Sequence, residues 1–248
     1  MTIAPGESEC ELWIERLRGE LARKRQFTMM VAHEIRNLLA PLATGVQLLA
    51  RDDSAMTMHV TPVIARQLAQ LRRLVDDLLD VACSEQGRMS LDVAPLDLRE
   101  VIGAAIEVAQ PAIAAQEHHL TLSPDPPAAI VDGDRCRLTQ VLSNLLINAA
   151  KFTPKGGDIR ICLELGSGCV KVFIRDTGVG IPADLLPKIF DIYVRAPGRS
   201  DGTPAGLGLG LAVARQLVQS HGGTLCAHSA GAGKGSEFVM CLPVALNR

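Results

Sequence analysis

The sequence is poor in the features that mark several common protein classes. Aromatic residues make up 3% of the 248 residues, so aliphatic side chains must build any hydrophobic core. The formal net charge is −2, which argues against a general nucleic-acid-binding surface, because such surfaces carry a clear positive excess. The uncharged stretch 37–50 is shorter than the roughly 18 apolar residues of a membrane-spanning helix. We therefore expect no membrane span in this chain.

Cysteine is present but is not arranged for a metal site. The seven cysteines are odd in number and scattered, and no C-x-x-C occurs. Reduced core or surface thiols of a cytoplasmic protein explain them best. The N-terminus also lacks the basic start and apolar centre of a signal peptide, so we expect a cytoplasmic location. The cysteines are Cys10, Cys83, Cys136, Cys162, Cys169, Cys226 and Cys241.

The first third of the chain has the apolar periodicity of long amphipathic helices. Apolar residues from Phe27 to Leu49 follow spacings of 4, 4, 3, 4, 4 and 3, and those from Ile64 to Ala82 follow spacings of 4, 3, 4, 3 and 4. Each set places an apolar stripe on one helix face. The polar segment 51–57 predicts a turn between two antiparallel helices. One hairpin cannot bury both stripes well, so we expect a homodimer that forms a four-helix bundle.

After Gly87 the pattern changes to alternating helices and strands. Helices are expected over 98–116, from Asp134 as the N-cap to about Lys151, and over 207–221. Strands are expected over 119–123, 128–131, 158–165, 169–175, 224–229 and 236–242. This order predicts an α+β domain with a mostly antiparallel or mixed sheet. The long segment 182–205, rich in glycine and proline, predicts a mobile lid.

The stretch HEIRNLLAPL, residues 33–42, begins like the zinc motif H-E-x-x-H, but Asn37 stands where the second histidine is required. His33 lies two residues from both Val31 and Ile35, so it points away from the apolar stripe and toward solvent. Asn37 lies one turn further along, on the same side. The pattern indicates an exposed histidine with a polar neighbour; the alternative is a surface histidine without a role.

The stretch NLLINAAKFT, residues 144–153, places three polar side chains on one helix face. Asn144, Asn148 and Lys151 are spaced i, i+4 and i+7, while Leu142, Leu145 and Ala149 take the other side. Amide oxygens beside a lysine suit a hydrated Mg²⁺ ion bound to phosphates. A solvated helix face is the alternative.

Two glycine-containing stretches indicate close backbone approach to a ligand. In DTGVGI, Gly178 and Gly180 follow Asp176, whose carboxylate can accept a hydrogen bond from an exocyclic amine. In GLGLGL, residues 206–211, glycines precede a helix whose N-terminal N–H groups can bind an anion. Ordinary turns are the alternative, because each motif alone is a weak signal. GKGSEF, residues 233–238, favours a structural turn.

In this order, the stretches resemble the ATP-binding domain of sensor histidine kinases, whose fold is shared with DNA gyrase, MutL proteins and heat-shock chaperone ATPases. The matching motifs are NLLINAAKFT, DTGVGI, IFDIYVR, GLGLGL and GKGSEF, and FTMMVAHEIRNLLAPL resembles the phosphoacceptor box of the dimerisation and histidine-phosphotransfer domain. The resemblance covers residues 26–244. It implies a lead-in helix (1–25), a helical hairpin domain (26–87), a linker (88–96) and an α+β sandwich that binds ATP (97–246).

The resemblance also implies roles for single residues. His33 would take the γ-phosphoryl group of ATP, Glu34 would orient the imidazole by accepting its other N–H, and Asn37 would position a water for dephosphorylation. Asn148 would be the principal Mg²⁺ ligand, with Asn144 beside it. The remaining implied nucleotide-site residues are Lys151, Phe152, Asp176, Gly178, Gly180, Ile181, Tyr193, Gly206, Leu207, Gly208, Leu209, Gly210 and Leu211. Phe190 and Tyr193 would anchor the lid.

The implied activity is that of an ATP-dependent protein-histidine kinase, which passes its phosphoryl group to an aspartate of a response-regulator receiver domain in trans. One residue departs from the family pattern, because Leu38 replaces a proline of the box. Proline bends a helix, so Leu38 is expected to stiffen it and to change the balance of kinase and phosphatase activity. An ATP-binding scaffold or phosphatase with weak kinase activity therefore remains an alternative. The His33 box disfavours a chaperone or DNA-repair ATPase.

Overall fold

The computed structural model describes residues 5–49, 54–85, 90–123, 128–166, 168–192, 194 and 208–245. The chain divides into two compact units, Met1–Leu78 and Leu79–Arg248. The first is helical, and the second contains all the strands of the described ranges. The fold class predicted from the sequence, a helical hairpin followed by an α+β domain, is therefore confirmed.

The first unit is built from two helices, α1 (Pro5–Leu49) and most of α2 (Ser54–Glu85). The described part of the predicted lead-in segment is helical and extends the hairpin helix, because α1 is continuous from Pro5 through Pro41. The helices approach closely at Gly45, where a Cβ atom would lie 2.8 Å from Cγ1 of Ile64. Within the described ranges, no helix combines the length and the apolar character that crossing a bilayer requires.

Only part of each predicted apolar stripe is buried within a single hairpin. Leu38 of the α1 stripe is 8% exposed, whereas in α2 a buried residue, Leu74, at 7% exposed, lies next to the predicted stripe position Val75. Three other stripe residues, Val46, Leu68 and Val75, remain 59%, 52% and 43% exposed. Two helices cover one side of each other, so a stripe that spans a wider arc keeps an uncovered flank.

The second unit contains a five-stranded sheet and a small two-stranded one. The strands are β1 (Ala94–Asp97), β2 (His119–Leu122), β3 (Ile130–Gly133), β4 (Asp158–Leu165), β5 (Cys169–Asp176), β6 (Thr224–His228) and β7 (Ser236–Pro243). The larger sheet has the order β2-β4-β5-β7-β6, and β1 pairs with β3. β2 and β4 are parallel, whereas the other neighbours are antiparallel. The predicted mixed sheet is confirmed.

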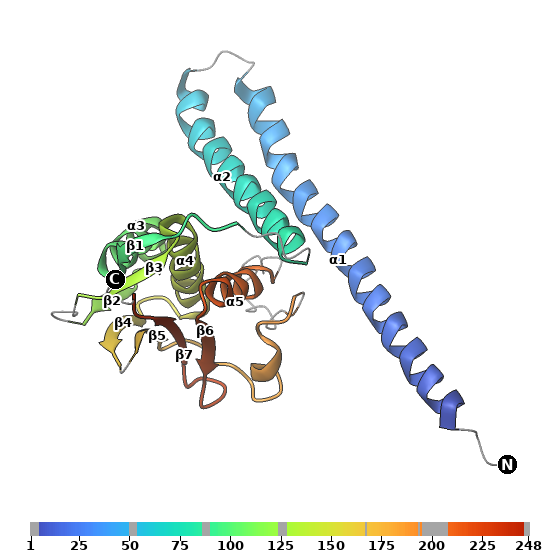
Figure 1. The fold of residues 1–248 in the computed structure, drawn as a ribbon. Helices are drawn as coiled ribbons and strands as arrows, with labels where there is room; N and C mark the ends of the chain where they lie inside the picture. The colour runs from blue at the N-terminus through green and yellow to red at the C-terminus, as the bar shows by residue number, and fades with distance from the viewer. Residues whose placement is uncertain are drawn as a thin grey trace. The chain divides into compact units, whose positions relative to one another are not determined.

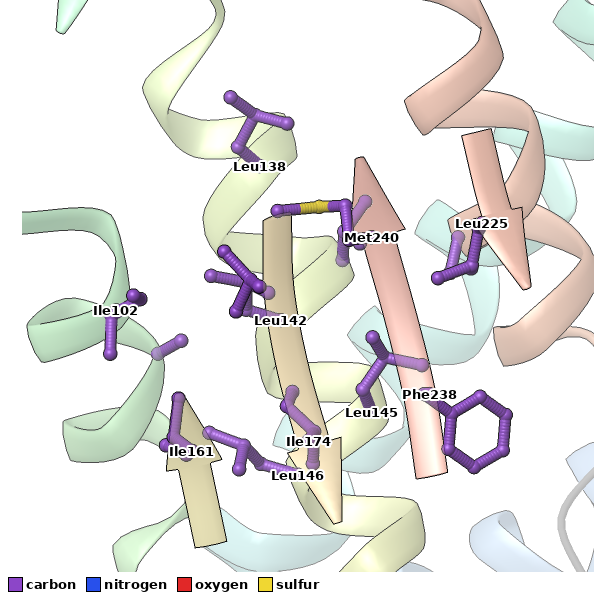
Figure 2. Close-up of a cluster of buried hydrophobic side chains, with 14 of the residues drawn as sticks. Ile102, Leu138, Leu142, Leu145, Leu146, Ile161, Ile174, Leu225, Phe238 and Met240 are labelled. Atoms are coloured by element: carbon purple, nitrogen blue, oxygen red, sulfur yellow. The ribbon is translucent and has the colours of Figure 1, made fainter. Parts of the chain in front are cut away.

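Three helices cover one face of the larger sheet: α3 (Leu98–Ala115), α4 (Arg135–Phe152) and α5 (Gly210–Ser220) (Figure 1). A short 3₁₀ helix, η1 (Leu186–Lys188), lies between β5 and α5 in the sequence. The core forms where α4 meets the sheet. Leucines of α4 face Ile161 of β4, Ile174 of β5 and Met240 of β7 (Figure 2). Each such buried side chain contributes about 1.5–3 kcal/mol, so α4 is held firmly against the strands.

Two predicted boundaries were wrong. Residues 94–96, predicted as linker, belong to β1, where Pro95 lies opposite Asp132 of β3. Proline is tolerated there because β1 is an edge strand, which can lack a donor N–H. The last helix begins at Gly210 rather than three residues earlier. Gly208 has a φ of 72°, and this left-handed conformation cannot continue a right-handed helix.

Candidate functional site

The histidine box lies in the second half of α1. His33 and Asn37 are exposed on the same helix face, whereas Leu38 is buried. The burial confirms the predicted orientation, in which the imidazole points away from the apolar stripe. A histidine held on a regular helix and open to solvent can meet a separate protein domain without rearrangement of the hairpin.

The imidazole of His33 has a defined neighbour. The amide nitrogen of Asn37 contacts Nδ1 of His33 at 3.1 Å. The predicted neighbour was Glu34, but among the described residues Glu34 makes no hydrogen bond to His33. The reason is helical geometry: residues i and i+4 share one face, whereas residue i+1 points about 100° around the axis. Asn37 is therefore the residue placed to influence the tautomer of the imidazole.

The start of α4 is fixed by its N-cap residue. The side chain of Asp134 accepts a hydrogen bond from the N–H of Arg137 at 3.1 Å and from that of Asp92 at 3.1 Å. Burial acts to raise the pKa of Asp134, but these N–H groups and that of Cys136 favour the carboxylate more, so the pKa lies below its ordinary value. The predicted cap is confirmed, and it sets where the polar face of α4 begins.

The polar face of α4 carries the predicted residues together. Asn144, Asn148 and Lys151 are half-buried, whereas Leu142, Leu145 and Ala149 on the opposite side are almost fully buried. The Nζ atom of Lys151 lies 5.4 Å from the ring centroid of Phe152. The division into a polar and an apolar face, read from the spacing, is confirmed.

The two asparagines differ in their surroundings. The amide nitrogen of Asn144 donates to the carbonyl oxygen of Gly210 at 3.5 Å, which ties α4 to the first residue of α5. This leaves the amide oxygen of Asn144 available, and Asn148 makes no side-chain hydrogen bond within the described ranges. No group of three or more His, Cys, Asp or Glu side chains converges on a metal site in those ranges. The amide oxygens of Asn144 and Asn148 are ligands of the kind that a hydrated Mg²⁺ ion accepts when its other ligands come from phosphates.

Asp176 lies at the end of β5 and is 5% exposed. Its Oδ1 atom accepts hydrogen bonds from the N–H of Gly178 at 2.8 Å and of Ser236 at 3.3 Å. Its Oδ2 atom accepts from the hydroxyl of Ser236 at 2.5 Å. A carboxylate has about four acceptor positions, so one remains for a ligand donor such as an exocyclic amine. The arrangement holds a buried acceptor in a fixed orientation.

The glycines around Asp176 are required by close contacts. A Cβ atom at Gly178 would lie 2.5 Å from Oδ1 of Asp176 and 2.6 Å from the carbonyl oxygen of Phe152. Gly180 has a φ of 71°, and a Cβ there would overlap the carbonyl oxygen of Gly231. The backbone at these glycines does make close approaches, as predicted, but to other parts of the chain: the Asp176 carboxylate and the carbonyl groups of Phe152 and Gly231. Ile181 beside them donates its N–H to the hydroxyl of Ser229 at 2.9 Å.

The segment predicted as a lid begins with an anchored end. Phe190 is 8% exposed and packs edge-on against Phe238 of β7 with ring centroids 6.3 Å apart. In Arg215 of α5, Cζ lies 5.4 Å from the Phe190 ring centroid and Nη2 lies 3.6 Å from Oδ1 of Asp191. Phe190 is thus an anchor, as predicted. Tyr193, Gly206 and Leu207 lie outside the described residues, whereas Gly208 and Leu209 lead into α5 and Gly210 and Leu211 are its first two residues.

Sequence reasoning missed three contributors to this site: Ser229, Ser236 and Arg215. Ser236 belongs to the GKGSEF stretch, which was interpreted as a structural turn. Its position directly opposite Asp176 in the β5–β7 register makes it a partner of that carboxylate. A serine at the start of a strand gives no local signal of such a role, because the register across strands is needed to find it.

Two histidines without a predicted role are structural. His118 and His221 are 9% and 8% exposed. Nε2 of His118 lies 2.8 Å from the carbonyl oxygen of Ala150. His221 accepts from the N–H of Asp134 at 3.0 Å and lies 2.7 Å from the carbonyl oxygen of Leu217. Backbone groups therefore satisfy both ring nitrogens of His221 and Nε2 of His118, whereas Nδ1 of His118 is buried without a hydrogen-bond partner in the described ranges.

Comparison with protein families gives two matches. Residues 23–87 match the His Kinase A (phospho-acceptor) domain, and residues 133–246 match the Histidine kinase-, DNA gyrase B-, and HSP90-like ATPase. The first match contains the His33 box, and the second contains α4, Asp176 and the glycine stretches.

Curated relatives cover nearly the whole chain. The adaptive-response sensory kinase SasA of Thermosynechococcus vestitus is 31% identical over an alignment of 265 positions, which covers 97% of this chain and 69% of that protein. The sensor histidine kinase AtsR of Burkholderia thailandensis is 32% identical over 231 residues, 91% of this chain and 38% of that protein. The chain spans less than half of several such relatives, down to 16% of the hybrid signal transduction histidine kinase D of Dictyostelium discoideum.

Solved structures share the arrangement. Full-length ShkA in complex with AMPPNP superposes with a TM-score of 0.66 at 25% identity, over 89% of this chain and 46% of that one. The histidine kinase ThkA in complex with the response regulator protein TrrA has a TM-score of 0.62 at 24% identity, over 92% of this chain and 64% of that one. At 24% identity, the likeness to ThkA shows a shared fold alone.

Proposed function

Because the chain belongs to the family of sensor histidine kinases, we propose that it is an ATP-dependent protein-histidine kinase that phosphorylates its own His33. The phosphoryl group then passes to an aspartate of a response-regulator receiver domain in trans. The observation that carries the proposal is the pairing of an exposed histidine in the phosphoacceptor box with an ATPase-type site in the same chain.

The first step requires a lone pair on the attacking nitrogen of His33. If Nε2 attacks, the proton of the neutral imidazole must reside on Nδ1. Asn37 supports this tautomer when its amide oxygen faces the ring, and the opposite tautomer when its nitrogen does. Glu34 is proposed to accept the other N–H of the His33 imidazole, and so to act as its base, when the nucleotide-bound domain arrives. Asn37 also has the polar character to position a water for dephosphorylation.

The nucleotide site is proposed around Asp176 and the polar face of α4. The remaining acceptor position of Asp176 suits the amino group of adenine, and Ile181 beside the glycine turn would pack against the ring. Asn148 and Asn144 are the proposed ligands of Mg²⁺, which when bound neutralises charge on the phosphates. Lys151 would contact the phosphates, and Phe152 would pack near the nucleotide. The proposed lid and phosphate contacts are Tyr193, Gly206, Leu207, Gly208, Leu209, Gly210 and Leu211.

The partners follow from the surfaces that this chain presents. A second copy of the hairpin would cover the uncovered flank of the stripes at Val46, Leu68 and Val75, which supports a homodimer with a four-helix bundle. ThkA is described in complex with a response regulator, and we assign the same class of partner to this chain. A reaction that consumes ATP belongs in the cytoplasm. The hairpin domain is proposed to end near residue 87, before the segment that leads into β1.

One observation favours a second candidate function. Leu38 is 8% exposed and belongs to the buried stripe, where family members carry a helix-bending proline. A stiffer helix below His33 would hinder the approach of the ATP-binding domain more than that of a water. The alternative is therefore an ATP-binding scaffold or response-regulator phosphatase with weak kinase activity.

The test is incubation of the full chain with γ-labelled ATP and Mg²⁺. Label that is acid-labile and alkali-stable identifies a phosphohistidine, and His33→Gln should abolish it. His59→Gln is the matched control, because His59 is an exposed histidine on the other helix of the hairpin. Label that persists in the His33→Gln protein would overturn the assignment. Label absent from the unmodified chain, together with rapid dephosphorylation of a phosphorylated receiver domain, would favour the alternative.

A further inference from the structure

The face of the large sheet turned away from the helices carries most of the described cysteines. Along a strand, alternate side chains point to opposite faces, and the buried residues of β5 and β7 mark the face that meets the helices. Cys169 precedes the buried Val170, and Cys241 lies between the buried Met240 and Leu242. Four free thiols share the outer face: Cys162, Cys169, Cys226 and Cys241.

Two of these thiols are neighbours. In the β5–β7 register, Cys169 lies opposite Pro243 and Lys171 lies opposite Cys241. Cys169 and Cys241 are therefore diagonal neighbours on adjacent strands and the same face, where Cα atoms lie about 7–8 Å apart, so a small shift of the strands would bring the two sulfurs into bonding distance. Both side chains are half-exposed, so small molecules in solution can reach them.

The pair sits where the strands can adjust. Cys169 is the first residue of β5, and Pro243 is the last residue of β7. A disulfide requires Cα atoms about 4.4–6.8 Å apart, and a strand end can shift to meet this more easily than the middle of a ladder. Gly166 in the preceding turn leaves the sulfur of Cys169 open, because a Cβ there would lie 3.5 Å from that sulfur.

The surroundings distinguish the two sulfurs. Burial and then the neighbouring Cys169 thiol raise the pKa of Cys241, while Lys171 acts in the opposite direction without cancelling the rise. Cys241 therefore stays protonated near neutral pH and can donate to the Cys169 sulfur. Lys171 lies two residues from Cys169 on the same strand and directly opposite Cys241.

We propose that Cys169 and Cys241 form an oxidisable dithiol, which hydrogen peroxide converts into an intramolecular disulfide between β5 and β7 that a thiol reductant reverses. The thiolate of Cys169 attacks the peroxide, so that an S–O bond forms, the O–O bond breaks and hydroxide leaves to become water. The sulfur of Cys241 then attacks the Cys169 sulfenic acid; the S–S bond forms, the S–O bond breaks, and the second hydroxide leaves with the proton of Cys241 as water. Two thiols and one peroxide give one disulfide and two waters.

The two strands that this bond would join also carry the buried acceptor of the candidate nucleotide site. Asp176 ends β5, and Ser236, its hydrogen-bond partner, begins β7 directly opposite. The disulfide closes the other end of the same strand pair. Oxidation should therefore raise the melting temperature of the chain, because it removes freedom from the unfolded state. A thiol reductant should reverse the shift.

The test uses the full chain, reduced and then treated with hydrogen peroxide before the remaining thiols are alkylated. Trypsin leaves Cys162 and Cys169 on one peptide, so cleavage after Glu164 is added to separate them. Non-reducing mass spectrometry should show a peptide that links Cys169 to Cys241 and that disappears on reduction. Cys226→Ser is the matched control and should leave this linkage unchanged.

Variants give the order of the steps. Cys241→Ser should lose the linkage and accumulate a Cys169 sulfenic acid that a dimedone probe captures, and Cys169→Ser should lose both. The melting curve of each reduced variant verifies that it is folded. The proposal is overturned if Cys169 and Cys241 stay fully alkylatable after peroxide treatment, or if the linkage found joins Cys226 to Cys241, or joins two chains.

Discussion

Replacement of Asp176 by asparagine separates the proposed adenine contact from the stability of the site. The substitution keeps the shape of the side chain. Its Oδ1 atom can still accept from the N–H groups of Gly178 and Ser236. The hydroxyl of Ser236, which now donates to Oδ2, can rotate and accept from the new amide nitrogen. The internal hydrogen bonds are therefore retained in number.

The proposed hydrogen bond between residue 176 and the adenine amino group is not retained. The amino group of adenine is a donor, and in the Asp176→Asn protein it meets an NH₂ group that is also a donor. A hydrogen bond to a charged group contributes about 1.5–3 kcal/mol, which corresponds to ATP binding that is about 10- to 150-fold weaker. The carboxylate is 5% exposed, so little water is present to replace the lost partner.

The assay is calorimetric titration of the full chain with ATP and, in parallel, with GTP. Guanine carries a carbonyl oxygen where adenine carries the amino group, and an amide NH₂ can donate to it. Asp176→Asn should therefore narrow the preference for ATP over GTP as well as weaken ATP binding. Asp184→Asn is the matched control, since this exposed carboxylate lies a few residues further along and the charge change is the same. Its titrations should match those of the unmodified chain.

One result would refute the reasoning. If the Asp176→Asn protein melts as a folded domain and binds ATP as tightly as the unmodified chain, then Asp176 does not contact the adenine amino group. Weak binding of both ATP and GTP in a protein with a strongly lowered melting temperature would indicate that Asp176 acts through the fold alone.

Three further outcomes are expected. Asp134→Ala should lower the free energy of unfolding by about 1 kcal/mol in denaturant titrations at neutral pH. Because the folded-state pKa of Asp134 is depressed, its contribution is present above the unfolded pKa and is lost as the pH falls through the folded pKa, so the two proteins should converge in acid. Gly180→Ala should prevent stable folding, because a Cβ there would overlap the carbonyl oxygen of Gly231. Gly156→Ala should lower the free energy of unfolding by about 1–2 kcal/mol in thermal melts, because Gly156 has a φ of 75° but no atom lies within 4 Å of a new Cβ. Leu38→Pro should change the ratio of autophosphorylation to dephosphorylation rates, and equal rates in both proteins would contradict the idea that Leu38 stiffens the helix.

Local sequence patterns were sufficient for the elements and for much of the candidate site. The apolar spacing predicted both long helices, and the alternation in β4 and β5 gave their bounds to within one residue. Asp134 was recognisable as a cap because capping depends on neighbours in sequence. Asn144 and Asn148 were placed on one face for the same reason, since helical periodicity is local.

Strand β1 and the partner of His33 were harder to predict. Pro95 reads as a linker residue, and only its pairing with β3 reveals an edge strand. For His33 the resemblance favoured Glu34, whereas the helix geometry brings Asn37 to the imidazole. Family patterns report which residues occur together, but not which side chain is nearest in the absence of a ligand.

The sequence by itself determined which face of α4 is buried, where α3 and α4 begin and which residue types could bind a nucleotide, because these depend on contacts within a few positions. Tertiary structure alone decided that Ser236 supports Asp176 from 60 residues away and that Cys169 lies beside Cys241. Both pairs depend on the order and register of β5 and β7. A shift of one residue in that register would turn each side chain to the other face, so no local pattern can encode the pairing.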